Sequence, residues 1–135
     1  MSVPRYWREI PERSRLEASK CTTCGNVIYP PRARCAKCGG NSIEPYQLPE
    51  KGKLLTFTVI RSPPRSFEKM APFILGIIEL KDGARLTTQI TDITPEEVNI
   101  GMPVEAVFRK VSEDGDSGII QYAIKFRPVF RYKSV

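Results

Sequence analysis

Apolar and polar residues alternate along most of the chain after residue 50, with the period of two that is typical of half-buried β-strands. In KLLTFTVIR, for example, Leu55, Phe57 and Val59 occupy every second position. The same alternation recurs further along the chain and predicts strands there. The segments expected to form strands are 53–61, 73–80, 84–92, 102–111 and 119–126.

Turn and cap signals between these segments indicate how the strands are connected. KDG (81–83) is a hairpin turn signal, whereas TPEE (94–97) has the form of a helix capping box, and Gly101 stands where a short helix would end. Three strands, a short helix and two strands is the element order of the OB-fold, a five-stranded Greek-key barrel. We therefore expect a barrel over 49–127, with Gly76 at a bulge or bend that curls it.

The aromatic residues of the expected barrel lie in register with apolar neighbours. Phe57, Phe108, Tyr122 and Phe126 each fall on the apolar side of their alternating segment. This placement predicts that all four side chains pack in the core.

The first 20 residues have a different pattern, a broken amphipathic one that predicts one or two short helices. Its apolar members are Tyr6, Trp7, Ile10, Leu16 and Ala18. We expect Trp7 to pack on a neighbouring element, with the alternative that it anchors a partner protein. The predicted N-terminal helical segment covers 1–20.

Composition is that of an ordinary globular protein, with 41% hydrophobic and 27% charged residues among 135. This length suits one compact domain with a small appendage. No stretch approaches the roughly 18 apolar residues of a membrane span, and the N-terminus is charged from Arg5 onward instead of carrying the apolar region of a secretion signal. We therefore expect a cytoplasmic protein, whose thiols stay reduced.

All four cysteines lie in CTTCGNVIYPPRARCAKCGG as two Cys-x-x-Cys pairs, each followed by glycine. Two such tight turns offer four thiolates, from Cys21, Cys24, Cys35 and Cys38, to one tetrahedral ion. Soft thiolates at this geometry favour Zn²⁺, with iron as the runner-up and a dithiol redox centre as a further alternative. The sequence thus predicts a zinc ribbon over 21–48.

The same assignment argues against catalysis. Four protein ligands leave no open position for water or substrate, so the ion would be structural. The chain has no histidine, and with every cysteine bound to metal the usual pairs of nucleophile and base are absent. We therefore predict that the protein is not an enzyme.

Net charge is +6, and its distribution matters more than its total. Residues 51–127 carry only +1, whereas 1–20 and a basic C-terminal tail over 128–135 carry +2 each. Proteins that bind single strands need a basic groove with exposed aromatic side chains. Single-stranded nucleic-acid binding, which the combination of a zinc ribbon and an OB-fold invites, is therefore the alternative function.

Several segments together carry a resemblance to a known family. They are VPRYWREIPERSRLEASKCTTCGNVIYPPRARCAKCGG, GKLLTFTVI, PFILGIIEL with its DG turn, and NIGMPV. The chain resembles the acyl-CoA-associated family of small proteins with a rubredoxin-like zinc ribbon and an OB-fold, in its archaeal branch. The resemblance implies a non-catalytic bridge between acetoacetyl-CoA thiolase and HMG-CoA synthase of the mevalonate route, which helps to enclose coenzyme A and lets the synthase pull the uphill condensation.

The loop between the first two strands, RSPPRSFEKMAP, is long for a hairpin and is the place where we expect ligand contact. Arg61, Arg65 and Lys69 are candidates for the phosphates of coenzyme A. Phe67 and Met70 are candidates for its adenine or pantetheine. The alternative is a solvated loop held by its prolines.

Overall fold

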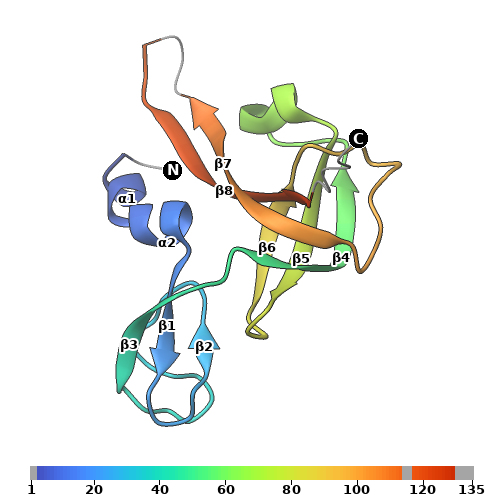
Figure 1. The fold of residues 1–135 in the computed structure, drawn as a ribbon. Helices are drawn as coiled ribbons and strands as arrows, with labels where there is room; N and C mark the ends of the chain where they lie inside the picture. The colour runs from blue at the N-terminus through green and yellow to red at the C-terminus, as the bar shows by residue number, and fades with distance from the viewer. Residues whose placement is uncertain (1–2, 114–116, 130–135) are drawn as a thin grey trace, which may run out of the picture.

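The computed structural model describes residues 3–113 and 117–129, and shows two short N-terminal helices, a small sheet, and a closed barrel that follows directly after the last strand of that sheet (Figure 1). It confirms the predicted fold class, mainly β with short N-terminal helices. The elements are α1 (Val3–Arg8), α2 (Ile10–Arg15), β1 (Glu17–Cys21), β2 (Val27–Ile28), β3 (Ile43–Gln47), β4 (Lys51–Ile60), the 3₁₀ helix η1 (Arg65–Met70), β5 (Phe73–Leu80), β6 (Arg85–Ile90), β7 (Pro103–Glu113) and β8 (Ile120–Pro128).

The barrel contains the five strands expected from the alternation, and each strand falls within a few residues of its predicted segment. The strand order around the barrel is β4-β5-β6-β8-β7, and all neighbours are antiparallel except β6 and β8. The one parallel pairing, Ile90 with Phe126, closes the wall. This closure leaves no long open edge on the barrel.

Gly76 lies at a bend, as expected. The register of β4 against β5 shifts between Leu54 and Thr56, next to the position where Gly76 pairs with Phe57. A Cβ atom on Gly76 would lie 2.7 Å from Leu54 Cδ1 and 3.0 Å from the Thr56 carbonyl oxygen. The close approach of the two strands therefore requires glycine here.

The short helix expected after Thr94 is not formed. Residues 95–97 make a single turn, in which the Glu97 N–H donates to the Thr94 carbonyl at 3.0 Å. Val98 is then buried, and the Gly101 N–H donates to the Leu54 carbonyl at 2.7 Å. Because the barrel binds this segment at both points, the capping signal is not followed by further helical turns.

Two six-residue helices, α1 and α2, confirm the prediction for the N-terminal segment, but β1 already begins at Glu17. The expectation that Trp7 packs on a neighbour is wrong, because its side chain is 74% exposed. The expected tail over 128–135 lies outside the described residues from 130 onward.

Two of the four aromatic side chains assigned to the core are correctly placed, since Phe126 is fully buried and Phe57 packs partly buried against the core. Phe108 and Tyr122 are instead 52% and 37% exposed. The reason is that β7 and β8 continue as a hairpin that projects past the other barrel strands (Figure 1). The apolar alternation continues along this hairpin after the barrel wall has ended.

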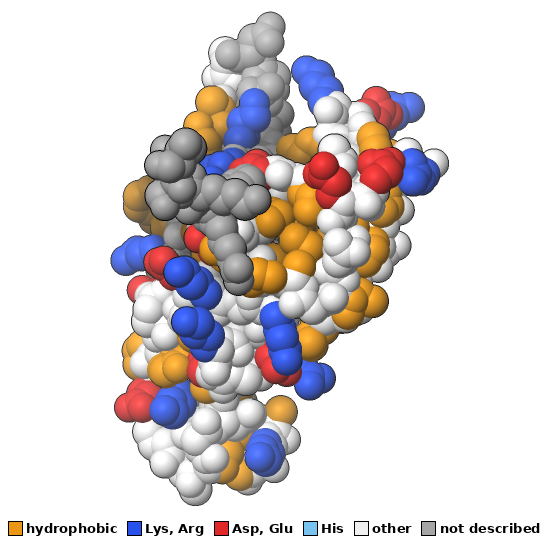
Figure 2. Space-filling view, turned by 45° about the vertical axis from the view of Figure 1, so that its right-hand side comes forward, with side chains coloured by type: hydrophobic (Ala, Val, Ile, Leu, Met, Phe, Trp, Pro, Cys, Tyr) orange, Lys and Arg blue, Asp and Glu red, His pale blue; other side chains and the backbone are white. Residues whose placement is uncertain are grey.

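Charged side chains of both signs are interspersed on the face shown in Figure 2. Several barrel cations are held by barrel carboxylates. Arg109 Nη2 lies 3.0 Å from Asp92 Oδ2, and Arg127 Nε lies 3.1 Å from Glu105 Oε1. This pairing agrees with the nearly neutral charge of the barrel segment.

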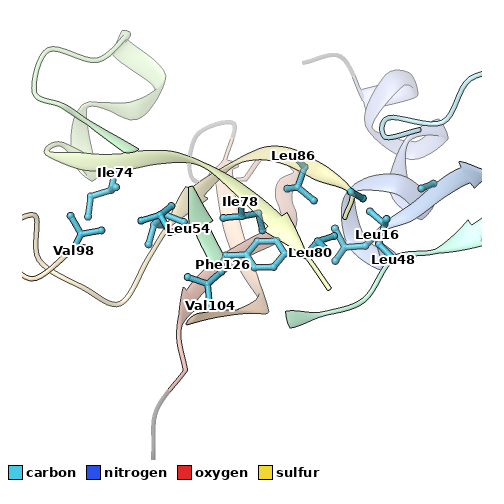
Figure 3. Packing of buried hydrophobic residues seen from close by; sticks show 13 residues of the cluster. Leu16, Leu48, Leu54, Ile74, Ile78, Leu80, Leu86, Val98, Val104 and Phe126 are labelled. Carbon is cyan, nitrogen blue, oxygen red and sulfur yellow. The ribbon is translucent and has the colours of Figure 1, made fainter. Parts of the chain in front are cut away.

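The core fills the barrel and continues toward the small sheet (Figure 3). Leu54, Ile78 and Phe126 occupy the barrel interior, while Leu16 and Leu48 extend the cluster at the junction with the N-terminal half. The Leu48 N–H donates to the Leu16 carbonyl at 3.1 Å. The two halves of the chain are therefore joined by shared apolar packing as well as by the connecting chain.

Candidate functional site

The cysteines lie in two turns of the same form on the small sheet. In the first, the Gly25 N–H donates to the Cys21 carbonyl at 2.9 Å, and in the second the Gly39 N–H donates to the Cys35 carbonyl at 3.0 Å. Both glycines have a φ of 74°, a left-handed conformation that side chains rarely adopt. The Cys-x-x-Cys-Gly pattern therefore forms the two tight turns that the sequence predicts.

These turns bring all four sulfur atoms together, within 4.8 Å of one another. The Sγ atoms of Cys21 and Cys38 lie 3.5 Å apart, and those of Cys24 and Cys35 lie 3.6 Å apart. Four ligands about 2.3 Å from a tetrahedral zinc ion would be separated by about 3.8 Å. The donor set and its spacing therefore fit zinc, as predicted for these four residues.

Backbone dipoles favour thiolates at the two buried positions. The N–H groups of Cys38 and Lys37 point at Cys35 Sγ, and the first is the main cause that lowers the pKa of Cys35 to about 6. The N–H of Cys24 likewise lowers the pKa of Cys21. Both sulfurs are thus prepared to bind a cation.

Crowding acts against complete ionisation of the cluster. The Gly40 N–H favours the thiolate of Cys38, but hydrogen bonds with Cys21, Cys35 and Cys24 together raise the pKa of Cys38 to about 11. A divalent cation offsets this repulsion and stabilises four thiolates in a small volume.

The metal centre is a closed structural site. Four protein sulfurs complete the tetrahedron and leave no position for a substrate, so a bound ion would link β1 to the segment that carries Cys35 and Cys38. Among the described residues, this is the one group of three or more cysteines or carboxylates arranged to hold a metal ion.

The candidate ligand loop divides into an outer and an inner side. Arg61, Arg65 and Lys69 are exposed, whereas Phe67 and Met70 are partly buried. Phe67 packs on Phe73, with 5.9 Å between ring centroids. The assignment of the three cations to phosphates remains a prediction.

A second candidate site was not expected from the sequence and lies on the projecting hairpin. The rings of Phe108 and Tyr122 stack at 5.2 Å with an angle of 15° between their planes, and Ile120 beside them is 42% exposed. No signal in the sequence pointed to it, because the segments predicted as strands, 84–92 and 102–111, are of similar length, whereas β7 has 11 residues in the structure and β6 has 6.

Helix α1 lies against this hairpin, because the Tyr122 N–H donates to Tyr6 Oη at 3.1 Å. Val3 and Trp7, one turn apart on α1, are 49% and 74% exposed. We call Val3, Trp7, Phe108, Ile120 and Tyr122 the aromatic surface. Single exposed apolar residues are ordinary, whereas several on adjoining elements make this region a candidate protein contact surface.

A four-cysteine ribbon followed by a closed five-stranded barrel defines a zinc-ribbon and OB-fold protein. The chain belongs to the DUF35 family, as its similarity to the DUF35 domain-containing protein described below shows. Residues 8–44 match the rubredoxin-like zinc ribbon domain of ChsH2, and residues 46–109 match its C-terminal OB-fold domain. No helix among the described residues is long and apolar enough to cross a membrane.

Several known proteins are similar to this chain over most of its length. A DUF35 domain-containing scaffold protein of Methanocaldococcus jannaschii is 49% identical over 94% of this chain and 91% of its own length. A solved chain described as an Ltp2-ChsH2(DUF35) aldolase superimposes with a TM-score of 0.70 at 27% identity, covering 95% of this chain and 96% of that chain. The benzoylsuccinyl-CoA thiolase subunit BbsA of Thauera aromatica is 26% identical over 84% of this chain and 76% of its own length.

Proposed function

We propose that this protein is a non-catalytic scaffold that bridges acetoacetyl-CoA thiolase and HMG-CoA synthase in the mevalonate pathway. The observation that carries the proposal is the aromatic surface, which lies exposed on a protein whose relative is named a scaffold protein. Two further relatives are named for thiolase and aldolase assemblies, which supports a thiolase as one partner. The choice of HMG-CoA synthase as the second partner rests on the family resemblance carried by the sequence motifs.

The chemistry of the chain supports a role without catalysis. The sequence contains no histidine, and its four cysteines form the metal centre. General acid–base and nucleophilic catalysis most often rest on these two residue types, so the reactions of the complex would take place on the partner enzymes.

Within such a complex, the exposed cations of the loop after β4 would contact coenzyme A. Arg61, Arg65 and Lys69 stand on one short segment that ends in η1, with their side chains directed to solvent and available to phosphates. Phe67 holds the inner side of this segment against Phe73. The proposed role is to complete the wall of a site that lies mainly on the enzymes.

Single-stranded nucleic-acid binding is the second candidate, and one observation favours it. The stacked Phe108 and Tyr122 rings lie exposed on an OB-fold, where bases could stack on them. The cations near this hairpin argue against it, because Arg109 and Arg127 are paired with barrel carboxylates and do not form a free basic groove. We therefore place it second.

Purification of the untagged protein from its native cells tests the two candidates together. We expect acetoacetyl-CoA thiolase and HMG-CoA synthase among the associated chains identified by mass spectrometry, in amounts that nuclease treatment leaves unchanged. Mock purification from cells lacking the gene provides the control. The scaffold proposal would be contradicted if the protein were recovered only with nucleic-acid-binding proteins, in a complex that nuclease treatment breaks apart.

A further inference from the structure

An open cavity of about 500 Å³ lies between α2, η1 and the barrel strands, apart from the metal centre and the aromatic surface. Its volume falls in the range of small-molecule sites, about 300–1,000 Å³. Most of its wall is apolar. The residues that form the apolar wall include Phe67, Phe73, Leu75, Leu86 and Ile124.

Lys125 is the unusual member of this wall. It lies on β8 and is only 7% exposed. The only polar contact of its ammonium group among the described residues is Met70 Sδ at 4.0 Å, and a thioether sulfur is a weak acceptor. No carboxylate in the described part of the chain lies within ion-pair distance of Lys125 Nζ. A cation buried in this way loses water without gaining a counter-ion.

The electrostatic surroundings agree with this geometry. Burial is the main cause that lowers the pKa of Lys125, and the positive charge of Arg109 acts in the same direction. A bound anion would stabilise the charged form of Lys125.

The other polar side chains that line the cavity either form an ion pair within the protein or carry no charge. Arg13 also lines it, but its guanidinium Nε lies 2.6 Å from Glu9 Oε2. Thr87 and Thr88 are also among the lining residues, and a threonine hydroxyl carries no charge but can donate to an oxygen anion. Lys125 is therefore the group that would select the charge of a ligand, and the apolar wall would select its tail.

We propose that this cavity binds an apolar carboxylate, whose hydrocarbon chain packs on the wall and whose carboxylate pairs with Lys125. The inference does not depend on the proposed scaffold function, since its central group, Lys125, belongs neither to the aromatic surface nor to the loop after β4, although Phe67 and Met70 of that loop lie beside the cavity. The proposed site is distinct from the metal centre and from the aromatic surface.

The test titrates the zinc-loaded full-length protein with octanoate and follows the methyl NMR signals of Leu75, Leu86 and Ile124. We expect saturable shifts of these signals with octanoate, and binding at least about tenfold weaker for octanol, which lacks the charge, and for acetate, which lacks the tail. Lys125→Met should lose this preference and bind octanoate and octanol alike. Lys81→Met, in the exposed turn between β5 and β6, is the matched control and should bind octanoate as the native protein does.

A second readout separates a binding role of Lys125 from a structural one. Because its ammonium has no carboxylate partner, Lys125→Met should melt at a temperature equal to or above that of the native protein. Octanoate should raise the melting temperature of the native protein and of Lys81→Met by more than that of Lys125→Met. Equal binding of octanoate and octanol to the native protein, undiminished octanoate binding by Lys125→Met, or a lower melting temperature of that variant would each overturn the proposal.

Discussion

Cys35→Ser is expected to abolish stoichiometric zinc binding and to unfold the small sheet, while the barrel strands remain paired. Cys35 is buried and donates one of four sulfurs, so the serine variant leaves an incomplete site. Structural zinc contributes an apparent binding free energy of about 10–16 kcal/mol in small domains. Apart from Leu16 and Leu48 at the junction, the buried residues of this half are small, so no apolar core replaces the metal.

Metal analysis, thiol reactivity and hydrogen exchange measure the outcome together. The native protein should hold one zinc per chain, whereas Cys35→Ser should hold well under one, with its remaining thiols reactive and the amides of β1 and β3 exchanging rapidly. Ala36→Ser, an exposed substitution in the same turn, is the control and should keep its zinc. Full zinc content in Cys35→Ser, or a protected small sheet without metal, would contradict the structural role.

The second large effect is expected at the aromatic surface. Trp7→Ser, and the double variant Phe108→Ser with Tyr122→Ser, should each weaken binding to the thiolase partner by about 30-fold or more, because buried aromatic anchors contribute about 2 kcal/mol or more at protein contacts. Trp7 is 74% exposed in the free protein, so Trp7→Ser should change the melting temperature little. The double variant removes a stacked pair of partly exposed rings, so a modest decrease is expected for it. Surface plasmon resonance with the purified partner measures the change.

Ile100→Ser is the matched control, since Ile100 is 68% exposed but lies outside the aromatic surface. It should bind the partner with native affinity. The same variants also distinguish the second candidate function. If Phe108 and Tyr122 served to stack bases, their loss would weaken oligonucleotide binding and leave binding to the enzymes intact, and that result would favour nucleic acid over a scaffold.

Periodicity and spacing were enough to predict the metal centre and the barrel strands. Cys-x-x-Cys-Gly is a local pattern whose turn geometry depends on the residues within it, and the φ of 74° at Gly25 and Gly39 follows from that pattern. Alternation likewise reports a half-buried strand wherever one side faces apolar atoms. Both features need no knowledge of distant parts of the chain.

The predictions from sequence were wrong where segments that are distant in the chain determine the surroundings of a residue. Alternation could not show that the barrel wall ends before Phe108 and Tyr122, because that end depends on the lengths of other strands. The segment from Thr94 has a sound capping signal, yet contacts of Val98 and Gly101 with the barrel replace the helix with a turn. Lys125 alternates with Ile124 and Phe126 and would be expected in solvent, but it lines a cavity that η1 helps to enclose.

The positions of the metal centre, the aromatic surface and the loop cations indicate how the protein could act as a scaffold. Metal holds the small sheet, and the short helices connect that sheet to the projecting hairpin through the bond between Tyr6 and Tyr122. The aromatic surface and the exposed cations of the loop lie on separate elements, α1 with the β7–β8 hairpin and the segment that ends in η1. A chain with separate contact regions is able to meet more than one partner.

Sedimentation velocity of purified acetoacetyl-CoA thiolase, HMG-CoA synthase and this protein tests the bridging role most directly. With all three present, we predict one rapidly sedimenting boundary that contains every chain. Without this protein, the two enzymes should sediment as separate boundaries. Association of the enzymes in its absence, or separate boundaries in its presence, would contradict the account.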